Sequence, residues 1–129
     1  YIEVFDCRPV PPTRDLAGDW LDQATGLRNA HLKGQHLRLP GFGEHGPTLE
    51  IFQYDEMLER SVPSAANRLG LGHLAFEVDQ VEETLKVLLA NGGHKIGEVV
   101  KQEIAGVGVI TFTYASDPEG NLLEIQSFP

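Results

Sequence analysis

The chain has few residues of the kinds that cross-link proteins or bind nucleic acids. Its single cysteine, Cys7, cannot form an intrachain disulfide, which favours a reducing compartment. Ten Lys and Arg stand against 19 Asp and Glu, a net charge of −9, and the basic residues are scattered. Because a nucleic-acid partner requires a basic face, this composition argues against one. The acidic balance suits a cytoplasmic protein.

Long apolar runs and the motifs of several enzyme classes are also missing. No run approaches the length of a membrane span, and no charged-then-apolar leader precedes the fold, so we expect neither membrane insertion nor export. There is no Gly-x-x-x-x-Gly-Lys phosphate loop and no nucleophile elbow around a serine. With 129 residues and 41% hydrophobic content, the chain has the length of one domain, or of two small modules sharing a core.

A short phrase occurs twice, and each copy contains a glutamate. Residues 46–54 are GPTLEIFQY and residues 120–128 are GNLLEIQSF, so both contain Gly-x-x-Leu-Glu-Ile. Each run alternates, which predicts a β-strand with its glutamate, Glu50 or Glu124, opposite the Leu/Ile pair. A carboxylate in the middle of a strand is unfavourable unless a metal or a buried partner compensates it. The repeat indicates a duplicated module with a site between the copies.

The second copy belongs to a complete strand-helix-strand-strand-strand unit, residues 70–129. Residues 71–78 alternate, with His73 on the face opposite Leu74 and Phe76. Asp79 is the expected N-cap of a helix over 80–91. After the helix we expect a weak strand at 94–104, a strong strand at 107–115 and a last strand at 121–127.

The first copy shows only the end of that order. We expect strands at 31–39 and 48–54, then a linker at 55–69 with a short helix around 55–60. His73 precedes Glu124 by 124 − 73 = 51 residues, and the same spacing before Glu50 falls at 50 − 51 = −1. We therefore expect the first module, residues 1–54, to lack its opening strand and most of its helix, and the sequence to be a fragment or to lack its first stretch.

Three side chains form the candidate site. If the strands make one curved sheet with helices outside, Glu50, His73 and Glu124 line its inner face. Two carboxylates and an imidazole suit zinc, nickel, iron or manganese. Taken singly, a strand histidine is usually a satisfied polar residue and a strand glutamate usually faces solvent. The repeat together with the complete unit favours the metal site. His36 either lines the cavity or faces solvent.

The residues GHLAFEVDQVEETLKVLLANGG and FTYASDPEGNLLEIQ resemble the second module of the vicinal oxygen chelate superfamily. That superfamily includes glyoxalase I, methylmalonyl-CoA epimerase, extradiol dioxygenases, and fosfomycin and bleomycin resistance proteins. The segments HLRLPG and TLEIFQY extend the resemblance, and YIEVFDCRPV is similar to the family's helix end and second strand. The resemblance implies an α+β fold: two βαβββ modules forming a curved, open sheet cup around a metal, with helices outside.

Carried over residue by residue, the resemblance makes Glu50, His73 and Glu124 the metal ligands. The fourth ligand, usually a histidine, would fall before Tyr1. A glutamate at position 50 is similar to the glyoxalase I arrangement, in which a metal-bound glutamate moves a proton between adjacent carbons. Either Glu50 or Glu124 would then be the catalytic base. Extradiol dioxygenases do not need Glu50, although Tyr114 is placed like an acidic tyrosine in some of them.

The resemblance therefore implies a glyoxalase-like, metal-dependent lyase, isomerase or epimerase acting on a small oxygen-chelating substrate. The alternatives are an extradiol-type dioxygenase and a non-catalytic small-molecule binder of the antibiotic-resistance type. Phe52, Tyr54 and Tyr114 are candidates for the substrate pocket together with His36, and the three aromatic residues are equally compatible with the core. We expect a homodimer, because an open cup leaves sheet edges and apolar surface for a second copy to cover.

Overall fold

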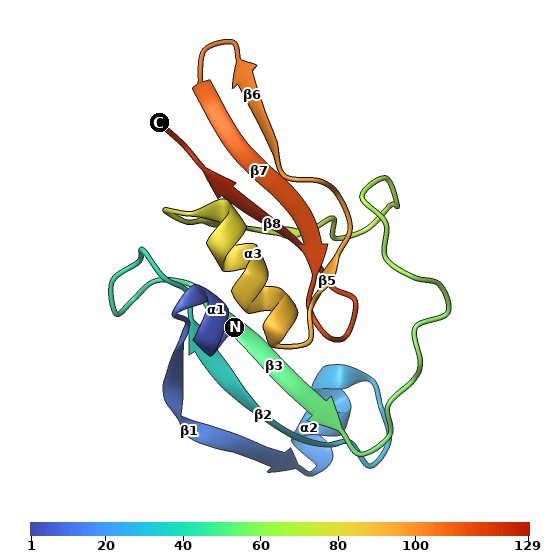
Figure 1. Ribbon diagram of the computed structural model, residues 1–129. Coiled ribbons are helices and arrows are strands. Elements are labelled where there is room, and N and C mark those ends of the chain that lie inside the picture. Colours follow the sequence, from blue (N-terminus) through green and yellow to red (C-terminus); the bar gives the residue numbers. More distant parts are fainter. The chain divides into compact units, whose positions relative to one another are not determined.

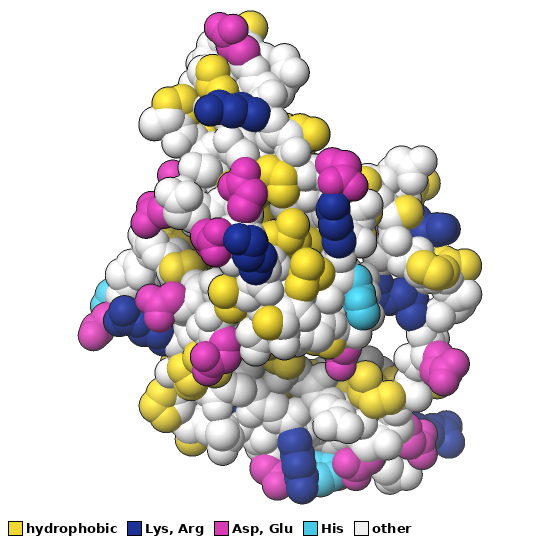
Figure 2. All heavy atoms as spheres, viewed as in Figure 1, with side chains coloured by type: hydrophobic (Ala, Val, Ile, Leu, Met, Phe, Trp, Pro, Cys, Tyr) yellow, Lys and Arg dark blue, Asp and Glu magenta, His cyan; other side chains and the backbone are white.

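The computed structural model describes residues 1–129 and divides into two compact units (Figure 1). Unit 1 comprises Tyr1–Ile2 and Asp6–Arg60, and unit 2 comprises Glu3–Phe5 and Ser61–Pro129. Each unit contains one open β-sheet and helical segments. No helix has both the length and the apolar character needed to cross a membrane. On the face shown in Figure 2, Lys and Arg side chains are interspersed with Asp and Glu.

Unit 2 has the predicted strand-helix-strand order. Its sheet has the strand order β4-β8-β7-β5, with β6 also paired to β7, and only the β4–β8 pair is parallel. The predicted second strand is split, because Ile96 and Gly97 both donate their amides to the carbonyl of Tyr114. The elements are β4 (Leu74–Glu77), α3 (Val81–Ala90), β5 (His94–Lys95), β6 (Val100–Ile104), β7 (Gly108–Ser116) and β8 (Leu122–Ser127).

The core of unit 2 lies between α3 and one face of the sheet. Val81, Leu85 and Leu88 recur at helical spacing and are buried. On β8, Leu123 and Ile125 are completely buried, and α3 packs on this strand. The period-2 pattern of β8 therefore places Glu124 on the opposite face, which is the inner face predicted from the sequence.

The start and end of α3 differ in how well the sequence predicts them. The predicted N-cap at Asp79 is wrong: Gln80 occupies that position and makes no side-chain cap hydrogen bond. The reason is that Val78 still pairs with the sheet, donating its amide to the Gln126 carbonyl at 2.8 Å, so the helix begins later. At the other end, a Cβ on Gly93 would lie 2.6 Å from Leu88 Cγ, so only glycine fits where the helix returns to the sheet.

Unit 1 is an antiparallel meander with the strand order β1-β2-β3. The predicted strands at 31–39 and 48–54 are present. Phe5, which comes before this meander in the chain, belongs to unit 2 and stacks there on Phe76, with ring centroids 3.9 Å apart. The short helix expected around 55–60 is absent: Met57 and Leu58 are exposed, so no apolar face stabilises it. The elements of unit 1 are β1 (Arg8–Ala17), α2 (Asp19–Thr25), β2 (His31–Arg38) and β3 (Thr48–Tyr54). The short helix α1 (Ile2–Phe5) precedes them, and its residues Glu3–Phe5 belong to unit 2.

Strand β1 contains three prolines and still joins the sheet. It is an edge strand, so one side of its backbone needs no hydrogen-bond donors. The pairing with β2 is also irregular between Val10 and Arg14, the stretch that contains Pro11 and Pro12. Its edge position and this irregularity explain how a proline-rich segment pairs with β2.

Candidate functional site

His73 and Glu124 lie side by side on the inner face of the unit 2 sheet. His73 directly precedes β4, and Ala75 of β4 is paired with Glu124 of β8, so the histidine shares the face of the glutamate. His73 Nε2 is 2.9 Å from Glu124 Oε2. Glu124 is the more buried of the two, with its side chain 14% exposed against 31% for His73. An imidazole nitrogen and a carboxylate oxygen in contact can share a proton or bind one cation.

Tyr114 completes this cluster from the neighbouring strand. It is the residue directly opposite Glu124 across β7 and β8, and its ring meets the His73 ring edge-on at a centroid distance of 5.0 Å. Burial raises the pKa of the Tyr114 phenol, and the charge of Glu124 and a hydrogen bond to it add to the rise. The phenol therefore stays protonated near neutral pH. Glu124 thus has two neighbours on this face, His73 and Tyr114.

Unit 1 contains a second histidine-glutamate pair. His36 of β2 is directly opposite Glu50 of β3, and His36 Nε2 lies 3.4 Å from Glu50 Oε1. The Glu50 side chain is 54% exposed. Glu50 is thus less constrained than Glu124, because it has one loose ion-pair contact and solvent on the other side.

The two glutamates have different partners at the same place in the pairing pattern. The residue opposite the repeated glutamate is His36 in unit 1 and Tyr114 in unit 2. The separations along the chain are 50 − 36 = 14 and 124 − 114 = 10, because the two hairpin loops differ in length. Sequence reasoning missed this correspondence. The signal was present as two alternating strands before each glutamate, but the pairing register depends on the loop.

Two of the aromatic pocket candidates pack beside the core of unit 1. Phe52 and Tyr54 lie against a buried cluster of Leu21, Ala30 and Leu32. Phe52 also approaches the His36 ring, with centroids 5.6 Å apart. These contacts give both residues a packing function and place Phe52 next to the His36–Glu50 pair. Their contact with a substrate stays a prediction.

The structure brings the candidate ligands together in pairs, one pair in each unit. No group of three or more His, Cys, Asp or Glu side chains is arranged to hold a metal ion. Glu50 belongs to unit 1, whereas His73 and Glu124 belong to unit 2. The participation of Glu50 in the same site as His73 therefore stays a prediction from the repeated sequence.

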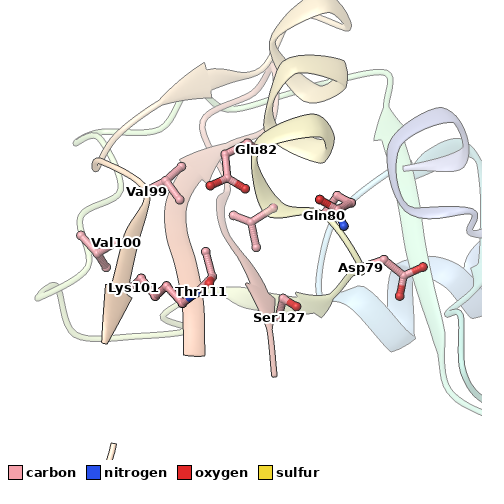
Figure 3. A pocket seen from close by; sticks show the side chains of 9 residues that line it. Asp79, Gln80, Glu82, Val99, Val100, Lys101, Thr111 and Ser127 are labelled. Atoms are coloured by element: carbon pink, nitrogen blue, oxygen red, sulfur yellow. The ribbon is translucent and has the colours of Figure 1, made fainter. Parts of the chain in front are cut away.

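A separate hollow in unit 2 lies beside the start of α3 (Figure 3). It has a volume of about 300 Å³, and its polar lining includes Glu82 from α3, Lys101 from β6 and Ser127 from β8. None of the predicted site residues lines it. The hollow is thus distinct from the cluster of His73, Tyr114 and Glu124.

His31 forms an ion-paired clamp in unit 1. Its Nδ1 lies 2.8 Å from Asp55 Oδ2 and its Nε2 lies 2.6 Å from Asp15 Oδ1. Because both ring nitrogens face carboxylate oxygens, the imidazole is doubly protonated in this arrangement. Hydrogen bonds to Asp15 and Asp55 raise the pKa of His31 above its usual 6.5, and the bond to His31 lowers the pKa of Asp15. The clamp joins residues at one end of the meander.

This clamp predicts how stability changes with pH. The raised pKa of His31 contributes stability that is complete below pH 6.5 and is lost as the pH rises through the folded-state pKa. Denaturant unfolding between about pH 6 and pH 9 should therefore show a loss of stability in the wild type that His31→Gln lacks. His94→Gln is the control, because His94 is exposed and forms no ion pair. Equal pH dependence of the wild type and His31→Gln would contradict the assignment.

Comparison with known proteins gives the family. Residues 15–125 match the model of the Glyoxalase/Bleomycin resistance protein/Dioxygenase superfamily. A glyoxalase family protein from Bacillus cereus has a similar structure, with a TM-score of 0.82 at 20% identity, covering 99% of this chain and 82% of that one. An integron cassette protein from the mobile metagenome of V. cholerae is 26% identical with a TM-score of 0.52, covering 100% of this chain and 81% of the other.

A protein from the mobile metagenome of V. pseudocholerae is 24% identical, with a TM-score of 0.52, covering 100% of this chain and 81% of the other. A search of curated proteins found no significant match. The likeness to the Bacillus cereus protein confirms the predicted α+β, glyoxalase-like fold with open sheets. The match over residues 15–125 confirms the resemblance inferred from the repeated glutamate strands: the chain belongs to the Glyoxalase/Bleomycin resistance protein/Dioxygenase superfamily.

Proposed function

We propose that the chain is a metal-dependent enzyme that transfers a proton next to a carbonyl group of a small substrate, as glyoxalase-like lyases and epimerases do. The observation that carries the proposal is the contact of His73 with Glu124, 2.9 Å apart on the inner face of the sheet. The superfamily includes both enzymes and non-catalytic binders. A paired imidazole and carboxylate on the inner face of the sheet favour the enzymes.

The donor set fits a divalent ion of intermediate hardness: zinc, nickel, iron or manganese. His73 and Glu124 would hold it, and Glu50 is the third ligand that the sequence repeat predicts. The ion would stabilise the negative charge that develops on the substrate oxygens. Tyr114 lies opposite Glu124, and burial keeps its phenol protonated beside the carboxylate. Glu124, in contact with His73 and only 14% exposed, is suited to hold its position throughout a reaction.

Glu50 is better suited than Glu124 to act as the base. Its side chain is 54% exposed, and the Nε2 atom of His36 lies 3.4 Å from its Oε1. A carboxylate with such freedom can accept a proton from one carbon and return it to the next. His36 would orient Glu50 from the opposite strand. The sequence left the choice between Glu50 and Glu124 open, and the unequal burial of the two supports Glu50.

A second candidate function is an extradiol-type dioxygenase, which the position of Tyr114 favours. The tyrosine lies against the His73 ring and keeps its proton, so it can donate to a substrate oxygen. In this reading Glu50 would not take part in the reaction. The proton-transfer reaction therefore requires Glu50 of unit 1, whereas the dioxygenase reaction does not.

Metal analysis of the His73→Ala variant tests the shared part of both candidates. Protein purified without chelator should contain a divalent metal. The variant should lose most of it, because His73 Nε2 is one of the two proposed metal-ligating atoms that lie together in unit 2. His94→Ala is the matched control: it removes an exposed imidazole from the same unit and should keep the metal. Wild-type metal content in His73→Ala would show that the assignment is wrong.

A further inference from the structure

A second hollow lies in unit 1, at the β2–β3 hairpin, and none of the residues assigned above to the reaction lines it. It has a volume of about 740 Å³ and lies between the start of β1 and the loop that follows β2. Its walls combine apolar residues, Pro9, Pro11, Leu39, Pro40 and Phe42 among them, with charged ones. Two arginines, Arg8 and Arg38, line it together with Asp6, Glu44 and His45. Apolar walls beside two guanidinium groups suit a small anion with an apolar body.

The two arginines are placed directly opposite each other. Arg8 and Arg38 are paired residues across β1 and β2. Like charges at such a position repel, so an anion between them would relieve an unfavourable contact. Arg8 has one carboxylate nearby, Asp6 at 3.8 Å, and both of these side chains are largely exposed. That contact is too long for a hydrogen bond and leaves the Arg8 donors available.

Arg38 is the better anchored of the two. It is half-buried, and its Nη1 donates to the carbonyl of Gly46. A guanidinium has five N–H donors, so the remaining ones can meet two oxygens of a carboxylate or phosphate at once. The bond to Gly46 fixes the side chain in advance. A fixed donor loses less conformational freedom when it binds a ligand.

The loop that forms the far wall is also ordered. Leu39 donates its amide to Pro47 at 3.2 Å, and Gly46 donates to Gly43 at 2.8 Å. A Cβ on Gly46 would lie 2.2 Å from Cβ of Phe42, so the glycine lets the loop pack against the aromatic residue. The Phe42 side chain is nevertheless 59% exposed. An aromatic ring open to solvent offers a surface for the apolar body of a ligand.

Arg38, at the edge of the hollow, lies on the sheet face that carries Glu50. Arg38 and His36 are two residues apart on β2 and so share a face, and His36 is opposite Glu50. Two residues of strand span about 7 Å. A small molecule whose anionic group binds at the arginines would therefore extend toward Glu50.

We propose that this hollow binds the anionic group of a small molecule, a carboxylate or a phosphate attached to an apolar body, through Arg38 and Arg8. This assignment rests on the proposed function and defines its substrate as a small anion: the anionic end binds at the arginines, and the reacting end lies at Glu50. Asp6 and Glu44 also line the hollow and oppose anion binding; because Arg8 and Asp6 are about equally exposed, the half-buried Arg38 is the principal cation. Because the carboxylates repel an anion, removing the charge of Glu44 should tighten anion binding.

The experiment is a titration of the full chain, followed by amide and arginine side-chain NMR signals, with benzoate, phenyl phosphate and neutral benzamide. It is done in the presence of a metal chelator, so that failure of the metal proposal does not affect the result. Benzoate or phenyl phosphate should shift signals of residues 38–46, and benzamide should bind at least about tenfold more weakly. The tighter of the two anions identifies carboxylate or phosphate as the preferred group.

Variants identify the residues responsible. Arg38→Gln should weaken anion binding about tenfold or more, and Arg8→Gln should weaken it less, because Arg8 is the more exposed. Arg28→Gln, an exposed arginine of unit 1 outside the hollow, is the control and should bind as the wild type does. Glu44→Gln should tighten binding.

Equal binding of benzoate and benzamide would overturn the proposal. So would wild-type affinity in both Arg38→Gln and Arg8→Gln. Because the exposed Arg8 has no structural hydrogen bond, the second variant decides the matter even if Arg38→Gln disturbs the hairpin.

Discussion

Leu123→Ala should lower the free energy of unfolding by about 3 kcal/mol. Leu123 is completely buried in β8, which lies between β4 and β7 and under α3. Removing its side chain leaves a cavity that a strand paired on both sides cannot close by moving. Urea unfolding followed by far-ultraviolet circular dichroism measures the change.

Leu71→Ala is the matched control for this prediction. Leu71 is 91% exposed in the segment before β4, so the same substitution should change stability by less than about 0.5 kcal/mol. Similar unfolding midpoints for the two variants would show that β8 is not the centre of the unit 2 core.

Glu50→Gln should lower lyase or isomerase turnover by a factor of about 100 to 10,000. The amide has nearly the shape of the carboxylate but cannot accept the proton. Most of the metal should remain bound, because His73 and Glu124 are unchanged. Turnover is measured with the hemithioacetal of methylglyoxal and glutathione, alongside oxygen uptake with catechol.

The paired assay separates the candidate functions. An oxygenase would consume oxygen with catechol, and Glu50→Gln would have little effect on it. A non-catalytic binder would show neither activity, and its ligand affinity would not respond to chelator. Glu56→Gln makes the same chemical change at an exposed residue just after β3 and should leave turnover unaltered. Oxygen consumption that is indifferent to Glu50→Gln would exclude the proton-transfer proposal.

The elements that bury an apolar face were predictable from the sequence. Alternation around Leu123 and Ile125 predicts β8 to within one residue, and the spacing of Val81, Leu85 and Leu88 predicts α3. Burial imposes these patterns directly, since a one-residue shift of β8 would turn Glu124 into the core. The inward orientation of Glu124 follows from the same periodicity, whereas its contact with His73 depends on the pairing of β4 with β8.

Features that depend on pairing between strands were not predictable in this way. The prolines of β1 argue against a strand until its edge position is known. Whether His36 lies directly opposite Glu50 in the β2–β3 pair depends on the length and shape of the hairpin loop. The start of α3 depends on the last backbone hydrogen bond of Val78 rather than on the capping preference of Asp79. Each of these is settled by a contact with a distant segment.

The central place of β8 has a consequence for synthesis on the ribosome. Leu74 of β4 pairs with Leu123, which is 123 − 74 = 49 residues later in the chain. Translation adds about 5 to 20 residues per second, so β4 is synthesised roughly 2 to 10 seconds before the segment of β8 that pairs with it. The meander of unit 1 can pair as soon as Tyr54 has emerged. The apolar face of α3 is thus exposed during translation and is a natural target for chaperones that bind nascent chains.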